Sequence, residues 1–319
     1  MENRANTASM PRRRGHGVIR ELFSKNLILT LMLLPLILYV LVFSYAPMFG
    51  IILAFKNYVY SKGILRSDWN GFTNFKVIFQ TGQGWAVTYH TVLYNLAFMA
   101  VNLVFAVILA ILLAEVRGKK FRKTTQTMFL MPFFVSWVTA SAIAFNLLNT
   151  DTGAINSLLI ALGLPKYSFY NTPHFWPFLL VFFNAWKNVG YYMIIFLAAI
   201  TGIDQEIYEA AEIDGASVFQ RIWFITLPFL KSTTIVLILL QLGRVAFGDT
   251  SMFWNLTGNN AILYPVTDII DTFVLRTMYN SHNFSIAAAA GAYQSVLGFA
   301  IIMTVNFIVK KVQPDYALF

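Results

Sequence analysis

The stretch "EAAEIDGASVFQRIWFITLP", residues 209–228, connects two long apolar runs of the chain. Five acidic residues lie within it or directly before it: Asp204, Glu206, Glu209, Glu212 and Asp214. Segments that flank membrane spans in the cytoplasm normally carry an excess of Lys and Arg. The cause of this local excess of acids therefore decides how the whole sequence is interpreted.

Composition places the chain among membrane proteins. Of its 319 residues, 58% are hydrophobic and only 12% are charged, and the mean hydropathy is +0.63, well above the values of soluble domains. The absence of cysteine excludes disulfides, thiol catalysis and zinc sites built on sulfur. The net charge of +9 does not indicate nucleic-acid binding, because the Lys and Arg flank apolar segments, as in other multi-pass membrane proteins.

Six segments are long and apolar enough to span a bilayer, which takes about 20 residues. They are residues 27–55, 89–115, 127–149, 173–201, 229–247 and 286–309. The first contains Pro35 and Pro47 and is expected to kink or tilt. The pattern predicts an all-α integral membrane protein: a basic tail (1–26), a six-helix domain (27–311) and a short tail (312–319).

The distribution of basic residues predicts the orientation. Residues 1–26, the loop after the second span, the acidic loop and the C-terminal tail together hold fifteen Lys and Arg, against six in the opposite loops. By the positive-inside rule both termini face the cytoplasm. The acidic loop, residues 202–230, lies on that side too, and it is the one segment of the cytoplasmic side in which acids outnumber bases.

The acidic loop is predicted to form two short helices. Asp204 can cap the first helix, Gly215 permits a sharp turn, and Ser217 with Gln220 forms a capping box for the second. Pro228 marks the start of the fifth span. Helices that rest on a lipid surface are usually basic, so this acidic elbow with small alanines is better suited to docking another protein.

Residues 209–228 resemble the EAA loop in the permease subunits of bacterial ABC importers. That loop reads EAA, then DGA, then an apolar stretch that ends in I-x-L-P. The matching positions are Glu209, Ala210, Ala211, Asp214, Gly215, Ala216, Ile225, Leu227 and Pro228. Ile222 stands where the family usually has an aromatic residue, and a proline often found after the L-P pair is missing. Nearly the whole chain follows the family's spacing of spans, the basic tail excepted.

The resemblance implies a type I ABC importer permease fold in the bacterial inner membrane, with loop 202–230 as the coupling helix that docks into an ATPase. It also implies a second, related permease, two ATP-binding subunits, an extracytoplasmic substrate-binding protein and surrounding lipid as partners. No G-x-x-x-x-G-K-[ST] phosphate loop occurs in the sequence. We therefore expect no cofactor on this chain, with ATP and Mg²⁺ on the partner ATPase, and no catalytic or metal-binding residues.

Further stretches, among them "SYAPMFGIILAFKNY" (44–58) and "MPFFVSWVTASAIAFNLLNTDTGAIN" (131–156), resemble the carbohydrate branch of these importers, near polysaccharide and alginate permeases. Independently, the fourth and fifth spans carry polar and aromatic residues at bilayer depth, where such residues usually mark a functional site. The candidate pathway residues are Asn184, Trp186, Lys187, Asn188, Tyr191, Gln241 and Arg244.

Two cations beside a pathway would favour acidic sugars such as uronates. The structural alternative pairs Arg244 with Asp249, or Lys187 with an acid of a partner permease. Asn95, Asn102 and Asn146 are expected to make interhelical hydrogen bonds. Asp249, Asp268 and Asp271 are expected to contact an external binding protein.

Other functions stay open at this stage. The transported substrate is a saccharide, and the alternatives to an acidic polysaccharide are a neutral oligosaccharide and glycerol phosphate. A membrane scaffold that docks a signalling protein would also explain the loop, although not Lys187 and Arg244 at bilayer depth. An intramembrane enzyme is disfavoured, because the spans contain no paired Asp, no Ser/His pair and no H-E-x-x-H.

Overall fold

The computed structural model describes residues 27–116 and 118–312. The predicted tail 1–26 lies outside these residues, as does nearly all of the predicted tail 312–319. The chain divides into two compact units, Met1–Ile52 and Leu53–Phe319, and each is described by itself.

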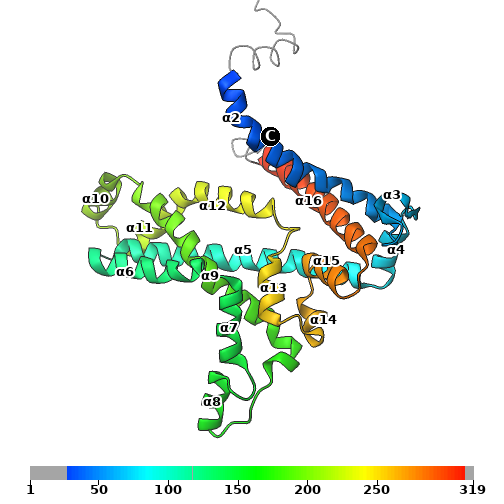
Figure 1. Ribbon diagram of the computed structural model, residues 1–319. Helices are drawn as coiled ribbons and strands as arrows, with labels where there is room; N and C mark the ends of the chain where they lie inside the picture. Colours follow the sequence, from blue (N-terminus) through cyan, green and yellow to red (C-terminus); the bar gives the residue numbers. More distant parts are fainter. Residues whose placement is uncertain (1–26, 117, 313–319) are drawn as a thin grey trace, which may run out of the picture. The chain divides into compact units, whose positions relative to one another are not determined.

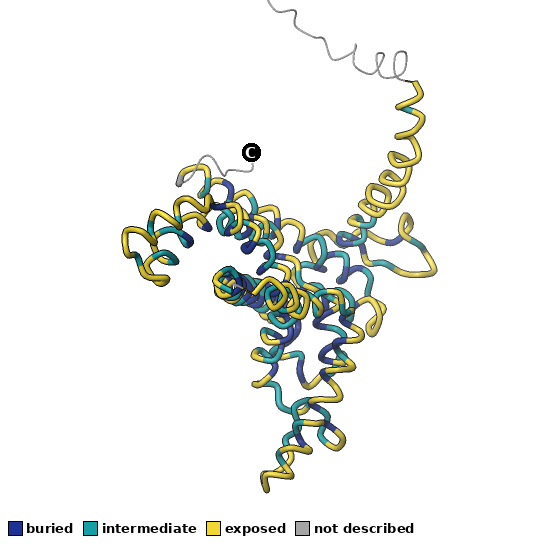
Figure 2. The backbone as a smooth tube through the Cα atoms, turned by 90° about the vertical axis from the view of Figure 1, so that its left-hand side faces the viewer, coloured by how far each residue is buried: buried dark blue, intermediate teal, exposed yellow. Residues whose placement is uncertain are grey.

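The described part of the first unit is one helical stretch. It comprises α2 (Leu27–Val40), a π-helical turn η1 (Leu41–Tyr45) and the start of the 3₁₀ segment η2 (Ala46–Phe55), which continues into the second unit. The π turn directly precedes Pro47, which has no N–H to donate to the helix ladder. Nearly all side chains of α2 are exposed and apolar (Figure 2), which fits a lipid-facing helix.

In the part of the second unit that the structure describes, the regular elements are helices and one small hairpin, in which β1 (Lys56–Asn57) pairs antiparallel with β2 (Asp68–Trp69). Its first helices are α3 (Gly63–Arg66), α4 (Thr73–Gln80), α5 (Gln83–Glu115), α6 (Lys119–Leu130), η3 (Met131–Phe134), α7 (Trp137–Leu148), α8 (Ala154–Ala161), η4 (Phe169–Asn171), η5 (Pro173–Phe175) and α9 (Trp176–Thr201). They are followed by α10 (Gln205–Ile213), α11 (Val218–Arg221), η6 (Ile222–Thr226), α12 (Leu227–Leu242), α13 (Thr250–Thr257), η7 (Ala261–Leu263), α14 (Tyr264–Thr267), α15 (Ile270–Tyr279) and α16 (Phe284–Val312).

The all-α fold class is confirmed. Among the described residues, five helices are long and apolar enough to cross a membrane: 27–55, 83–115, 173–201, 218–242 and 284–311. A sixth span exists only if the bent pair 119–134 and 137–148 counts as one. The second helix begins at Gln83, six residues before the expected start, because residues 83–88 continue its hydrogen-bonded turns.

The predicted third span, 127–149, is broken. Its two helices meet at an angle of 99° across Val135 and Ser136. Pro132 cannot donate a backbone hydrogen bond, and the Ser136 side chain accepts one from the Thr139 N–H, which starts a new helix. A count of apolar residues predicts one continuous span here and does not reveal this change of direction.

The predicted fifth span, 229–247, begins earlier and ends sooner. The chain is continuously helical from Val218 to Leu242, so the second short helix of the acidic loop runs directly into the span. The π turn η6 precedes Pro228 and allows the helix to pass a residue without an N–H. The helix then ends at Leu242, with Gly243 as its C-cap, five residues before the expected end of the span.

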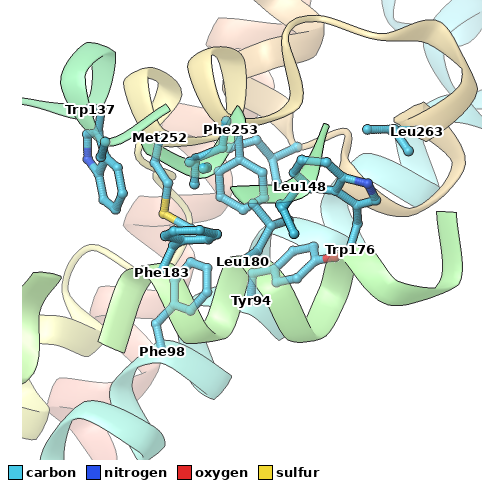
Figure 3. Close-up of a cluster of buried hydrophobic side chains, with 14 residues drawn as sticks. Tyr94, Phe98, Trp137, Leu148, Trp176, Leu180, Phe183, Met252, Phe253 and Leu263 are labelled. Carbon is cyan, nitrogen blue, oxygen red and sulfur yellow. The ribbon is translucent and has the colours of Figure 1, made fainter. Parts of the chain in front are cut away.

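The core of the second unit consists of three buried apolar clusters. α5 packs along α9, and α15 packs against α16 (Figure 1). The cluster in Figure 3 contains Tyr94, Phe98, Trp137, Phe183 and Phe253 among its members, and it joins α5, α7, α9 and α13. This packing fixes the relative positions of the helices that surround the candidate site.

Candidate functional site

A cavity of about 700 Å³ opens between α5, α9, α12 and the segment that leads to α13. Its lining is mostly amide, aromatic and charged. The lining residues are Asn95, Phe98, Asn102, Asn184, Asn188, Tyr191, Tyr192, Ile195, Leu237, Leu240, Gln241, Arg244, Phe247, Gly248, Asp249, Thr250 and Ser251.

Helical spacing brings these residues together. Asn184, Asn188 and Tyr191 are four and three positions apart on α9, so they occupy one face of that helix. Gln241 and Arg244 are three positions apart and approach from the C-terminal end of α12. Five of the seven residues predicted for the pathway therefore line one cavity.

Trp186 and Lys187 do not line the cavity. Trp186 packs against the buried cluster of Figure 3. The Lys187 ammonium donates hydrogen bonds to the backbone carbonyl oxygens of Phe133 (2.7 Å), Pro132 (3.5 Å) and Val135. The cation that the sequence analysis placed beside the substrate is thus bonded to the break between η3 and α7.

Two buried polar atoms in the cavity wall have no hydrogen-bond partner among the described residues. They are the acceptor Oδ1 of Asn102 and the donor Nε2 of Gln241. Buried polar groups are normally satisfied, and leaving one unpaired costs about 1–3 kcal/mol. One of these atoms is an acceptor and the other a donor, and a hydroxyl can serve either kind of group.

The two charged residues of the cavity differ in how they are bonded. Asp249 accepts from the Met252 N–H through Oδ1 (3.0 Å) and from the Trp137 indole N–H through Oδ2 (2.5 Å). Arg244 is exposed in the cavity and forms no ion pair with a carboxylate in the part of the chain that the structure describes. The anticipated pair of Arg244 with Asp249 is therefore not formed, and the guanidinium is open to an acidic ligand.

Six further polar lining residues were not assigned to the pathway from the sequence: Asn95, Asn102, Tyr192, Asp249, Thr250 and Ser251. The two asparagines do make the expected interhelical bonds, since Asn102 Nδ2 donates to Asn184 Oδ1 at 2.9 Å and Asn95 Nδ2 donates to the Val245 carbonyl at 3.0 Å. Their spacing of seven residues puts both on one face of α5. This seven-residue spacing in the sequence could have identified the Asn95–Asn102 face of α5 as part of the cavity wall.

Two carboxylates near the cavity are bonded inside the chain rather than presented to a partner. Asp268 is buried and accepts from Arg276 at 2.6 Å; burial raises the pKa of Asp268, and Arg276 opposes that shift. Asp271 accepts from the Gly248 N–H (2.8 Å) and from Gln294 (2.9 Å). Burial raises the pKa of Asp271 against these hydrogen bonds. The expectation that these two acids contact an external protein is wrong.

The acidic loop has the local structure that its sequence predicts. The Asp204 side chain accepts from the Glu206 N–H and starts α10, Gly215 has φ +81°, and Ser217 and Gln220 form a capping box at α11. Glu209 is exposed on α10. Two internal bonds hold the elbow together: Tyr208 to Thr226 (2.9 Å) and Arg221 to Glu212 (3.3 Å).

The remaining residues of the loop motif are Ala210, Ala211, Asp214, Ala216, Leu227 and Pro228, and their side chains are exposed or partly exposed. The outer face of the elbow is therefore small and acidic. No group of three or more His, Cys, Asp or Glu within residues 27–116 and 118–312 is arranged to hold a metal ion.

Comparison with known proteins assigns the chain to a family. Residues 102–314 match the family model described as the binding-protein-dependent transport system inner membrane component. Protein LplB of Bacillus subtilis (strain 168) is 37% identical over 291 residues, which cover 90% of each chain. The polygalacturonan/rhamnogalacturonan transport system permease protein YteP of the same strain is 35% identical over 89% of this chain and 88% of that protein.

Solved structures agree with this assignment. A chain of a bacterial ABC transporter involved in the import of the acidic polysaccharide alginate superposes with a TM-score of 0.83 at 29% identity, over 93% of this chain and 99% of that one. A chain of a bacterial alginate ABC transporter, in complex with a periplasmic protein that holds an alginate pentasaccharide, superposes with a TM-score of 0.80 at 30% identity, over 91% and 96%. The protein belongs to the family of binding-protein-dependent transport system inner membrane components, the permease proteins of ABC transporters.

Proposed function

We propose that this chain is the membrane-spanning subunit of an ATP-driven importer that moves an acidic oligo- or polysaccharide by alternating access. The observation that carries the proposal is the cavity between α5, α9 and α12, with its amide lining and with Arg244, which forms no ion pair with any described carboxylate. The polygalacturonan and alginate systems named above support an acidic substrate class.

The cavity suits a sugar for chemical reasons. Its amides both donate and accept hydrogen bonds, which sugar hydroxyls require. Tyr191 and Tyr192 offer ring faces on which a pyranose can stack. Arg244 supplies a planar fork of donors that matches a carboxylate in two parallel hydrogen bonds.

Because Lys187 is bonded to backbone carbonyls, a preference for acidic sugars rests on Arg244 alone among the cationic residues of this cavity. A neutral oligosaccharide would use the same amides and tyrosines without the guanidinium. It is the second candidate substrate, with glycerol phosphate as a smaller anionic alternative.

The acidic loop is proposed to be the coupling element. Glu209 and the alanines beside it present an acidic, small surface to a cytoplasmic ATPase, which would bind ATP and Mg²⁺. The proposal includes two ATP-binding subunits, a second permease that completes the pathway, an extracytoplasmic binding protein, and both termini on the cytoplasmic side of the inner membrane.

The test is the ATPase activity of the reconstituted complex, with its binding protein, across neutral and uronic oligosaccharides. We expect uronic sugars to stimulate selectively, and Arg244→Gln to raise their half-saturating concentration about tenfold or more, the value of a lost charge-assisted hydrogen bond. The matched control Arg66→Gln, at an exposed position, should leave it unchanged.

Each other outcome has a defined meaning. Stimulation by neutral sugars only, with no effect of Arg244→Gln, would retain the importer and remove the acidic substrate. A complex that no saccharide stimulates would favour the scaffold interpretation of the loop.

A further inference from the structure

The break in the third span leaves backbone carbonyls without helical partners inside an apolar segment. η3 ends at Phe134 and α7 begins at Trp137. The Pro132 carbonyl still accepts from the Val135 N–H at 3.1 Å, whereas the carbonyls of Phe133 and Val135 receive no backbone N–H from the described residues of the following turn. In a membrane an unsatisfied backbone group is strongly unfavourable, so irregular backbone within an apolar segment requires a donor from elsewhere.

Lys187, in the middle of α9, supplies that donor. Its ammonium bonds to the carbonyl oxygens of Pro132, Phe133 and Val135, and thereby uses all three of its protons on the break. It also lies 5.7 Å from the centroid of the Phe133 ring and 5.4 Å from that of Trp137. A cation at the carbonyl end of a helix is further stabilised by the helix dipole.

The approach of α9 to this break depends on a glycine one turn further along. A Cβ built on Gly190 would lie 1.9 Å from the Phe129 carbonyl oxygen. No side chain fits there, so the backbone of α9 touches the end of α6 directly. Gly190 and Lys187 together seat the broken span against α9.

Two side chains of the break extend this contact to the cavity. Phe133 stacks on Tyr191, with ring centroids 4.7 Å apart and planes 13° from parallel. Trp137, which Figure 3 shows beside Met252, donates its indole N–H to Asp249. Both partners, Tyr191 and Asp249, line the cavity.

We propose that Lys187 is a positioning residue: its ammonium fixes the 99° break of the third span, and through Phe133 and Trp137 it holds Tyr191 and Asp249 in the cavity wall. This role differs from direct substrate contact. The consequence for transport rests on the proposed function, whereas the consequence for the geometry of the break does not.

The geometry is tested with spin labels, which the cysteine-free chain makes direct. Thr124→Cys on α6 and Ala142→Cys on α7 are exposed positions on the two sides of the break. In the purified complex we expect one narrow distance distribution with Lys187, and a broadened or shifted one with Lys187→Met. The control Lys76→Met, at an exposed position, should keep the narrow distribution. An unchanged distribution in Lys187→Met would overturn the proposal.

The transport consequence is tested by saccharide-stimulated ATPase activity. We expect Lys187→Met to raise the half-saturating saccharide concentration about tenfold and to leave unstimulated ATPase activity unchanged. Lys187→Arg, which keeps the charge and the donors, should recover most of the affinity. Trp137→Phe removes the indole N–H together with part of the buried ring system, and its effect should not add to that of Lys187→Met, because both act on Asp249.

If Lys187→Met does not accumulate, Trp137→Phe carries the test, and normal half-saturation in that variant would overturn the link from the break to the cavity. The link would also be overturned if the double variant raised the half-saturating concentration by the product of the two single effects, because the two substitutions would then act independently. A wild-type complex that no saccharide stimulates would instead reject the proposed function, and the spin-label distances would still decide the role of Lys187.

Discussion

The coupling loop and the cavity are built in opposite ways. The loop is one continuous stretch, residues 202–230, whose acidic and small residues are largely exposed and whose shape is set by caps and a turn within a few residues of each other. The cavity takes its lining from α5, α9, α12 and residues 247–251, which are far apart in the sequence. A substitution in the loop can therefore change its surface without disturbing other helices. The shape of the cavity, in contrast, depends on helix contacts that lie outside the cavity itself.

Two glycines illustrate the difference. Gly215 in the loop is required by its own backbone, because φ +81° is a left-handed conformation that side chains disfavour, and a Cβ there would meet nothing within 4 Å. Gly190 has an ordinary helical conformation, and it is required by the Phe129 backbone that lies against it. The first constraint can be recognised in the sequence of a turn, and the second cannot.

The largest functional effect is expected from Glu209→Lys in the loop. Reversal of an exposed charge leaves the fold intact, so membrane insertion and thermal stability should not change. Substrate-stimulated ATPase activity of the assembled complex should be abolished. Glu206→Lys, on the same helix, is the matched control and should retain most of the stimulation. Full stimulation in Glu209→Lys would show that the loop is not the coupling surface.

The largest effect on stability is expected from Gly190→Ala. The added Cβ would lie within 2.4 Å of two backbone atoms of Phe129, so α9 must shift away from α6. We expect a loss of more than about 3 kcal/mol, the upper end for overpacking, because backbone cannot move aside as a side chain can. The measurement is thermal unfolding of the purified protein. Gly291→Ala should leave thermal stability unchanged, because a Cβ there would meet nothing within 4 Å. An equal loss of stability in Gly291→Ala would show that contact with the Phe129 backbone is not the cause of the effect at Gly190.

The smallest effect concerns pH and Asp271, which bonds to Gly248 at the edge of the cavity. Burial raises the pKa of Asp271 above its ordinary value of 3.8, so the folded state binds this proton more tightly than the unfolded state. Its contribution to stability is therefore favourable at low pH and is lost as the pH rises through the raised pKa.

Asp271→Asn should flatten this dependence, with a change in Tm of about 2 °C between acidic and neutral pH. Asp214→Asn in the exposed loop is the control and should leave the pH profile of Tm unchanged. A pH profile that is identical in Asp271→Asn and in the wild type would exclude a contribution from Asp271.

Much of the molecule follows from sequence by local rules. The positions of the apolar helices follow from their length and composition, and the caps at Asp204, Ser217 and Gly215 follow from short-range hydrogen bonding and backbone sterics. The common face of Asn184, Asn188 and Tyr191 follows from helical periodicity. Each of these features involves residues within about two helical turns of each other.

The tertiary structure decided the rest. Whether Lys187 meets a ligand or a backbone depends on where the break of another span lies, and a count of apolar residues does not reveal a 99° change of direction. Likewise, Asp249 lines the cavity because α7 brings Trp137 to it, across 112 positions of sequence. The residues alone indicate where most spans lie, where the loop lies and which helix faces are polar, since those features depend on local periodicity, but they do not reveal the break of the third span. The partner of each buried charge was decided only by packing, because a charge within an apolar region bonds to whichever group the fold places within its reach.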